Sequence, residues 1–345
     1  MNKNDLIIFK PCLAYDALCA IAHSKFKVVR EGEPYLKEYM AAITKGLVLP
    51  NSVSQISHIL RDALPPDEIE NLSIGKLSES FPDMIEKGGN EYIYQHKDDI
   101  TTALKRMAKN DFGTFWTTHY HELLVNVCDQ YSKWVMQYDL EALKRDIGIV
   151  RGLEDVGNIR VYVSYFSNAT SYALTANTYV CGYSTEYPMT PDRLVCVLAH
   201  ELCHGFMNDN LEREYLKLCE SDDFLHRTHW AVNRNSFNEE EFVVAVENFL
   251  AVRNGLRTIE QARELLFIWF GSCMPVAALT FEQLILEKDV PRNMNEWFIE
   301  CLAKRIHAGS VKEQVDAVHS GFSSNFQKNW ENEDVFKEYK PLSLK

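Results

Sequence analysis

The feature that most constrains this chain is the segment 190–204, which combines a helix start, an apolar face and two histidines four residues apart. Thr190 is a suitable N-cap, Pro191 fits the first helical position, and Asp192 lies in the first turn, where the helix dipole favours an acid. The apolar residues that follow predict a buried face, made of Leu194, Val195, Val197, Leu198 and Leu202. A helix with such a face must be packed inside a folded domain.

His200 and His204 lie on one face of this helix, because residues at i and i+4 are neighbours on a helix surface. Two neutral imidazoles at this spacing hold a zinc ion against the helix. Glu201 follows the first histidine, so it can take a proton from a water whose pKa the metal lowers to about 7. The motif therefore predicts Zn²⁺ as the cofactor and Glu201 as the general base. The alternative is a helix on which these side chains are only polar.

A catalytic zinc site usually has a third protein ligand. One class of such enzymes has a histidine six residues after the second motif histidine and a glycine three residues after it. Asn210 and Met207 occupy those positions here, which excludes that class. The acidic residues of the segment 238–251 are the remaining strong candidates.

The segment 238–251 predicts a helix with Asn238 as N-cap, and Glu241 would complete a capping box. At about 100° per residue, Glu240 and Glu247 share a stripe that is otherwise apolar, whereas Glu241 falls toward the polar side. A carboxylate on an apolar stripe is either paired or bound to a metal. Glu240 is therefore the predicted third ligand.

Three neighbouring acids stay open as alternatives for that ligand: Glu241, Glu239 and Glu247. Glu241 also has a structural explanation as a capping residue, and acids in a first turn are favourable without any metal. Glu247 could instead accept a hydrogen bond from a ligand histidine, or pair with an arginine or lysine at the edge of the core.

The motif helix, followed some tens of residues later by a helical glutamate, resembles the gluzincin branch of the zincin metallopeptidases. The resemblance covers roughly residues 159–251 and is specific at His200, Glu201 and His204. It implies a peptidase acting on a peptide or protein substrate, with Glu201 as general base. It also implies that the strand before the motif helix, similar here in residues 176–179, pairs with an extended substrate backbone.

Other residues near the motif allow different interpretations. Cys181 before Gly182 resembles the cysteine ligand of peptide deformylases, although this chain is far longer than those enzymes. A buried strand cysteine is the simpler interpretation. His226 and His229 could reach the cleft and stabilise an oxyanion, but a structural role for both is favoured.

The order of elements predicts an α+β fold that is mostly helical. Residues 1–150 indicate a helical N-terminal region, and residues 151–345 a zincin-like catalytic domain with a small sheet. Residues 159–165 alternate with period two, as in a half-buried strand, and residues 172–183 predict a second strand or hairpin. Beyond residue 190 the pattern is again helical.

Composition limits the partners and the compartment. The net charge is −13 and no Lys/Arg-rich run occurs, so a nucleic-acid partner is not expected. No stretch approaches the roughly 18 apolar residues of a membrane span. Nine cysteines without a Cys-x-x-Cys pair, together with the lack of a signal-peptide pattern, predict a cytoplasmic protein with reduced thiols. Export by a route that needs no signal stays open.

Three functions are compatible with these features. A zinc-dependent peptidase is favoured, because Glu201 lies beside a metal ligand and a structural zinc normally has neither an open position nor an adjacent base. A non-catalytic binding or regulatory protein with a vestigial or structural metal site is the alternative from another class. A metallohydrolase of a non-peptide substrate is the third.

Overall fold

The computed structural model describes residues 6–23, 34–88, 91–167, 170–232, 239–266 and 274–319. It is mostly helical with one four-stranded mixed sheet, which confirms the predicted α+β class. The chain divides into two compact units, and each unit is built from two separate stretches. The first unit comprises residues 1–138 and 157–194, and the second comprises residues 139–156 and 195–345.

This division differs from the predicted boundary at residue 150. The N-terminal stretch is not purely helical, because β1 (Ile7–Pro11) pairs in parallel with β2 (Ile159–Ser164), with Ile7 opposite Ile159. The sheet therefore draws residues after 156 into the first unit. Conversely, helix α10 (Leu140–Arg151) belongs to the second unit.

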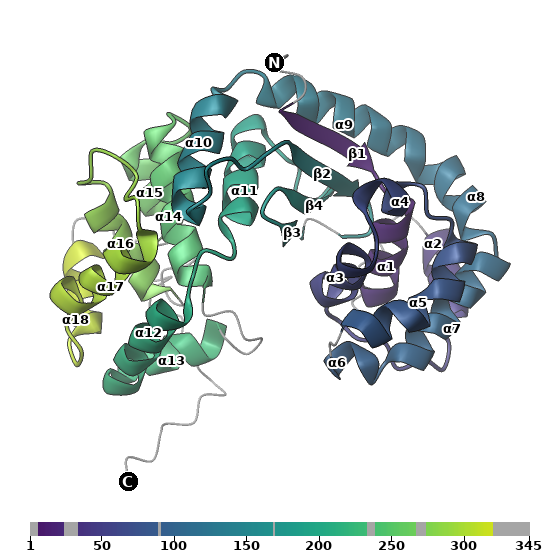
Figure 1. The fold of residues 1–345 in the computed structure, drawn as a ribbon, viewed down its shortest axis with the longest axis horizontal. Coiled ribbons are helices and arrows are strands. Elements are labelled where there is room, and N and C mark those ends of the chain that lie inside the picture. Colours follow the sequence, from purple (N-terminus) through teal and green to yellow (C-terminus); the bar gives the residue numbers. More distant parts are fainter. Residues whose placement is uncertain are drawn as a thin grey trace, which may run out of the picture. The chain divides into compact units, whose positions relative to one another are not determined.

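The sheet of the first unit has the order β1-β2-β4-β3 (Figure 1). β4 (Thr178–Gly182) is parallel to β2, and β3 (Tyr172–Thr175) is antiparallel to β4. The strand predicted at 159–165 and the hairpin predicted within 172–183 are thus confirmed. β4 is almost fully buried, which suits a strand that has a neighbour on each side.

The implied pairing of a substrate with the strand before the motif helix is wrong for Thr178–Val180 of β4, because β2 and β3 already occupy both edges there. β3 is the edge strand, and helix α3 (Val53–Ala63) covers part of that edge. His58 Nε2 lies 2.8 Å from the carbonyl oxygen of Ala173, and Arg61 Nη1 donates to the carbonyl of Leu174 at 2.8 Å.

Helices surround the sheet of the first unit. Helix α9 packs on β1 and β2, and helix α1 packs on β2 and α3. The described helices of this unit are α1 (Leu13–His23), α2 (Pro34–Thr44), α3, α4 (Pro66–Glu70), α5 (Ile74–Gly88), α6 (Glu91–Tyr94), α7 (Lys97–Lys109), α8 (Phe112–Trp116), the π-helical turn η2 (Thr117–His121) and α9 (Glu122–Val135). The first turn of α11 also belongs here.

A fully buried carboxylate, that of Asp16 on α1, ties three parts of the first unit together. It accepts hydrogen bonds from Trp116 Nε1 at 2.6 Å, Ser164 Oγ at 2.5 Å and the backbone N–H of Phe166 at 3.2 Å. Burial raises the pKa of Asp16 from 3.8 to about 6, although these hydrogen bonds lower it.

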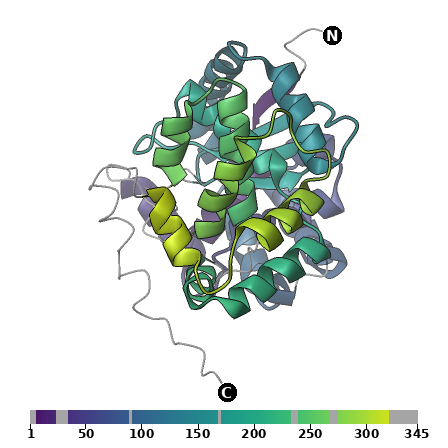
Figure 2. The ribbon, with the colours of Figure 1, turned by 90° about the vertical axis from the view of Figure 1, so that its left-hand side faces the viewer.

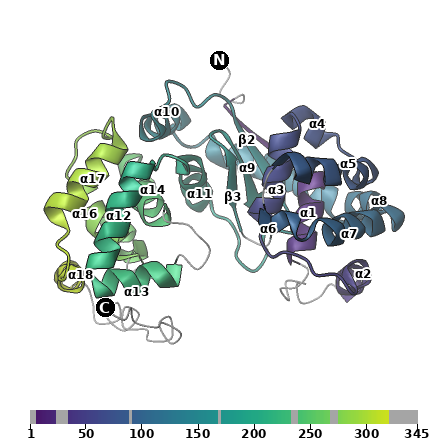
Figure 3. The same cartoon turned by 60° about the horizontal axis from the view of Figure 1, so that its bottom comes forward.

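The second unit is helical throughout its described residues (Figures 2 and 3). Its helices are α10, most of α11 (Pro191–Cys203), α12 (Asp209–Ser221), α13 (Asp223–Val232), α14 (Glu240–Arg253), α15 (Ile259–Leu265), α16 (Pro275–Leu284), α17 (Met294–Arg305) and α18 (Val311–His319). α14 packs on α16, and every residue from 241 to 251 is buried, so α14 is the centre of this unit.

Two further sequence predictions concern the whole chain. Among the described helices, none combines the length and the apolar character that a membrane crossing requires. The eight cysteines in the described residues are free thiols and all are buried, and Cys273 lies outside those residues.

Candidate metal centre

Helix α11 begins as the sequence predicts. Thr190 Oγ1 accepts a hydrogen bond from the backbone N–H of Arg193 at 3.3 Å, and Pro191 is the first helical residue. The predicted apolar face is buried, with Val197 half-buried. The helix ends at Cys203, and Gly205 turns the chain with a φ of +80°. His200 therefore lies on the last turn of this helix, and His204 directly follows its end.

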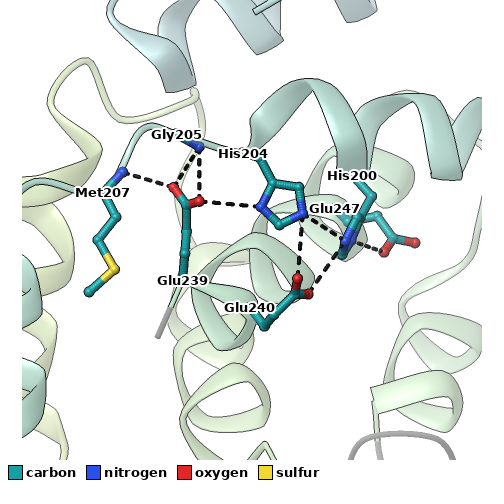
Figure 4. A network of polar contacts seen from close by, with 7 residues as sticks. All are labelled: His200, His204, Gly205, Met207, Glu239, Glu240 and Glu247. Carbon is teal, nitrogen blue, oxygen red and sulfur yellow. Dashed lines mark hydrogen bonds and ion pairs between the residues drawn. The ribbon is translucent and has the colours of Figure 1, made fainter. Parts of the chain in front are cut away.

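The structure brings together the three side chains predicted as metal ligands (Figure 4). His200 Nε2 and His204 Nε2 are 3.3 Å apart. Glu240, at the start of α14, lies beside both: its Oε2 is 3.5 Å from His200 Nε2 and its Oε1 is 3.5 Å from His204 Nε2. Within the described part of the chain, these residues form the one group of histidines, cysteines and acids close enough to hold a metal ion.

The spacing of these atoms suits a single metal ion. Zinc binds histidine nitrogen and carboxylate oxygen at about 2.0–2.2 Å, so two ligand atoms at a tetrahedral angle lie about 3.4 Å apart. The 3.3 Å between the two imidazole nitrogens matches that value, and each nitrogen lies 3.5 Å from a different oxygen of Glu240. One ligand atom from each of the three residues lies within 4.8 Å of the others, so the three could hold one ion.

Two further carboxylates orient the histidine rings (Figure 4). His200 Nδ1 lies 3.2 Å from Glu247 Oε2, and His204 Nδ1 lies 3.2 Å from Glu239 Oε2. A carboxylate only accepts, so each Nδ1 is the donor, which leaves the lone pair of each neutral Nε2 directed at the centre. Two imidazole lone pairs and a carboxylate then converge, and a positive charge among them satisfies all three.

The electrostatics of the centre agree with this chemistry. Burial alone lowers the pKa of His200, but hydrogen bonds to Glu240 and Glu247 raise it well above its usual range. Burial raises the pKa of Glu240, yet its interactions with His200 and His204 bring it below its usual range. The group thus favours ionised carboxylates around a cation.

Sequence analysis offered two alternatives for Glu247, a contact with a ligand histidine or pairing with an arginine or lysine. The structure has both: Glu247 lies beside His200 Nδ1 and also accepts a hydrogen bond from Arg257 Nη1 at 2.9 Å. Glu239 was considered only as an alternative ligand or as a charge at the helix start. Instead, it accepts hydrogen bonds from His204 and from the backbone N–H groups of Gly205 and Met207. The run of three acids from Glu239 to Glu241 was the sequence signal for a functional residue here. The neighbouring sequence does not indicate the partners of Glu239, because they lie more than thirty residues away.

The predictions that Glu241 lies toward the polar side of its helix and completes a capping box are wrong. Its side chain is 2% exposed and does not cap α14. It accepts hydrogen bonds from Tyr215 Oη at 2.7 Å and from the backbone N–H groups of Val276 and Ala277 at 2.6 and 3.1 Å. It thus binds the N-terminus of α16, where free N–H groups need acceptors. The predicted cap Asn238 lies outside the described residues.

The remaining predicted residues are placed as follows. Glu201 is 5% exposed on α11, and its charge is one of those that raise the pKa of His200. Cys181 is buried on β4 and does not belong to the metal-binding group. His226 is half-buried on α13, and the side chain of His229 lies outside the described residues.

No protein-family model, no curated protein and no solved structure matches the chain. The case for function therefore depends on the chemistry of this centre.

Proposed function

We propose that this chain is a zinc-dependent hydrolase that cleaves peptide bonds, with His200, His204 and Glu240 as metal ligands and Glu201 as general base. The observation that carries the proposal is the convergence of two imidazole Nε2 atoms and one carboxylate within the reach of a single metal ion. Both rings have their Nδ1 atoms committed to carboxylates, which is the usual arrangement of histidine ligands.

The exposure of the ligands favours a catalytic centre over a structural one. The side chains of His200 and His204 are each 18% exposed, and that of Glu240 is 26% exposed. A structural zinc is closed by four protein ligands, whereas a catalytic zinc has three and keeps one position open. Three partly accessible ligands correspond to the second case.

Each residue of the chain has a defined task in this proposal. A zinc ion held here would acidify a water and polarise the bond to be cleaved. Glu201, next to His200 on α11, accepts the proton of that water and later passes it to the leaving group. Its burial beside His200 keeps the proton transfer away from bulk solvent. Glu247 and Glu239 hold the two imidazoles in orientation.

The choice of a peptide substrate has separate support. It depends on the resemblance of the motif helix to that of the gluzincins, and not on strand pairing, because β2 and β3 flank β4 at Thr178–Val180. A test of substrate class must therefore include small esters and amides beside peptides.

The test combines metal analysis with the Glu201→Gln variant. We expect close to one zinc per chain in both proteins, because Glu201 is not a ligand. Peptide hydrolysis should fall about 10²–10⁴-fold in the variant, since an amide cannot accept the proton. The exposed residue Glu220 on α12 provides the control Glu220→Gln, which should keep full activity.

The other outcomes separate the alternatives. Undiminished turnover in Glu201→Gln contradicts the assigned base. Bound zinc with no hydrolysis of peptides, esters or amides supports a binding or regulatory protein, and cleavage of esters alone supports a non-peptide metallohydrolase.

A further inference from the structure

We infer that Arg151 is a substrate-binding residue that takes a carboxylate of the substrate beside the metal centre. The inference deepens the proposed function and rests on it, because it names the chemical class of substrate that the same centre would cleave. Arg151 is the last residue of α10, and it belongs to the second unit together with His200, His204 and Glu240.

The guanidinium of Arg151 lies against Gly205, the residue that directly follows the proposed ligand His204. A Cβ atom on Gly205 would come within 3.1 Å of Arg151 Nη1, 3.3 Å of Nη2 and 3.4 Å of Cζ. The φ of +80° at Gly205 also favours a residue without a side chain. The close approach of the guanidinium to this turn places a cation one residue along the chain from a metal ligand.

Arg151 has no carboxylate partner in the described part of the chain, unlike other arginines of the second unit. Three of those donate to acids: Arg253 to Asp146, Arg257 to Glu247 and Arg263 to Glu282. The Nε of Arg151 is closed to solvent and has no hydrogen-bond partner among the described residues. An arginine stays charged in proteins, and a charge that is buried without a partner is costly. An anion supplied from outside the chain would remove that cost.

Glu239 influences Arg151 but does not pair with it. Burial lowers the pKa of Arg151, and the nearby charge of Glu239 acts in the opposite direction. The oxygens of Glu239 already accept from the backbone N–H groups of Gly205 and Met207, and Oε2 also lies beside His204 Nδ1 (Figure 4). Glu239 therefore offsets part of the charge and leaves the donors of Arg151 available.

The helix dipole offers a simpler explanation for a cation at this position. Arg151 lies in the last turn of α10, where a positive charge is favourable. That effect acts equally on a fully exposed side chain. It does not account for a half-buried arginine whose Nε is closed to solvent and whose guanidinium lies against the turn that follows His204.

The chemistry of the guanidinium selects a carboxylate as its ligand. Its planar fork matches the two oxygens of a carboxylate with parallel hydrogen bonds. A peptide carries such a group at its C-terminus or on an acidic side chain. An extended peptide advances about 3.3–3.6 Å per residue, so a carboxylate held beside Gly205 belongs to a residue close to the bond that the metal centre attacks.

The experiment measures peptide binding by titration calorimetry to the zinc-loaded Glu201→Gln variant, which should bind substrate without cleaving it. The probes are N-acetyl-trialanine with a free carboxylate, its C-terminal amide, and the amide of N-acetyl-Ala-Glu-Ala. We expect one or both carboxylate probes to bind more tightly than the neutral amide. Adding Arg151→Gln should weaken that binding about 10–100-fold, the effect of losing hydrogen bonds to a charged group, and leave the neutral amide unchanged.

The two carboxylate probes distinguish the source of the anion. Dependence on Arg151 only for the free C-terminus indicates cleavage near the end of a peptide, and dependence only for the glutamate probe indicates cleavage beside an acidic residue. Both outcomes support the inference. Binding of all three probes that does not change in Arg151→Gln overturns it, as does a free-carboxylate probe and a glutamate probe that both fail to bind.

The matched control is Arg145→Gln, because Arg145 is an exposed arginine on the same helix and its removal changes the net charge equally. It should leave the binding of every probe unchanged. Arg151→Lys keeps the charge without the fork, so it should lose less affinity than Arg151→Gln. The zinc content of both Arg151 variants should stay close to one per chain, and thermal melts of the metal-free proteins should show no loss of stability. Lower stability with equal loss for all three probes indicates a structural role and overturns the inference.

The inference and the proposed function can fail separately. Binding that depends on Arg151 and on a carboxylate, in a wild type that hydrolyses no peptide, overturns the proposed function and leaves the carboxylate site supported. Hydrolysis of carboxylate and neutral peptides at the same kcat/KM, unchanged by Arg151→Gln, supports the proposed function and overturns the inference.

Discussion

Each of the two units of this protein holds one carboxylate at the centre of a polar network, and the surroundings of the two groups are opposite in kind. Asp16 in the first unit is surrounded by donors: an indole N–H, a hydroxyl and a backbone N–H. Glu240 in the second unit faces the Nε2 atoms of two histidines, whose Nδ1 atoms each lie 3.2 Å from another carboxylate. A carboxylate met only by donors needs nothing further, whereas one that faces two potential metal ligands can share a cation with them.

The comparison teaches that burial alone does not identify a functional acid. Asp16 is fully buried and Glu240 is partly exposed, yet only Glu240 belongs to a group that could hold a metal. The hydrogen-bonding partners decide the role. The following variants test whether that distinction is correct.

The largest effect is expected for Glu240→Ala. It removes one of three ligands, which should weaken zinc binding by roughly 4 kcal/mol, about a thousandfold in affinity. Competition with a chromophoric chelator measures the change. The variant also removes the partner of the His200 hydrogen bond, so thermal melts of the metal-free protein check separately that the chain still folds. Retained zinc affinity would mean that Glu240 is not a ligand.

Asp16→Ala should show the reverse pattern. It leaves the indole of Trp116 and the hydroxyl of Ser164 without their acceptor in the core, so the free energy of unfolding should fall by about 3 kcal/mol. Zinc affinity should stay within about twofold of the wild type, because the residue belongs to the other unit. Urea unfolding of metal-free protein measures the loss. A variant as stable as the wild type would contradict the assigned role of Asp16.

The same variant isolates a pH dependence. The pKa of Asp16 is raised from 3.8 to about 6 in the folded state, so the folded state holds this proton more tightly than the unfolded chain. The resulting stabilisation is complete below pH 3.8 and is lost as the pH rises through 6. Between pH 7 and pH 5, the stability difference between wild type and Asp16→Ala should therefore grow by about 1 kcal/mol. A difference that does not depend on pH would contradict the raised pKa.

The smallest effect is expected for Glu241→Gln, which sharpens the comparison between adjacent residues. An amide oxygen can still accept from Val276 and Ala277, and Tyr215 Oη can accept from the amide NH₂. The loss of charge assistance should cost less than about 1 kcal/mol of stability, with zinc affinity unchanged. If this variant loses its zinc while Glu240→Ala keeps it, the roles of the two residues are exchanged.

The sequence was sufficient where the signals are local. The cap at Thr190, the i and i+4 histidines and the buried face of α11 all lie within the short segment 190–204, and the structure places them as predicted. Glu240 was found because it shares an apolar stripe with Glu247. Both residues indeed lie beside the motif histidines.

The failures share a physical cause, which is that distant partners decide the outcome. The helical wheel assumes that one side of a helix faces water, but α14 is buried on all sides, so Glu241 on the supposed polar side is buried too. Glu239 precedes the helix and binds a turn more than thirty residues earlier in the sequence. β1 is short, and its partner strand follows only after ten α-helices and a π-helical turn in the described chain.

The pairing of β1 with β2 has a consequence for the synthesis of the protein. The ribosome adds roughly 5–20 residues per second, so Ile159 emerges on the order of ten seconds or more after its partner Ile7. During that interval β1 has no strand to pair with, and residues 139–156 of the second unit emerge before the sheet of the first can close. The first unit is complete only once Leu194 has emerged, when residues 195–345 of the second are still to be made, so the nascent chain exposes β1 as an unpaired strand until β2 follows.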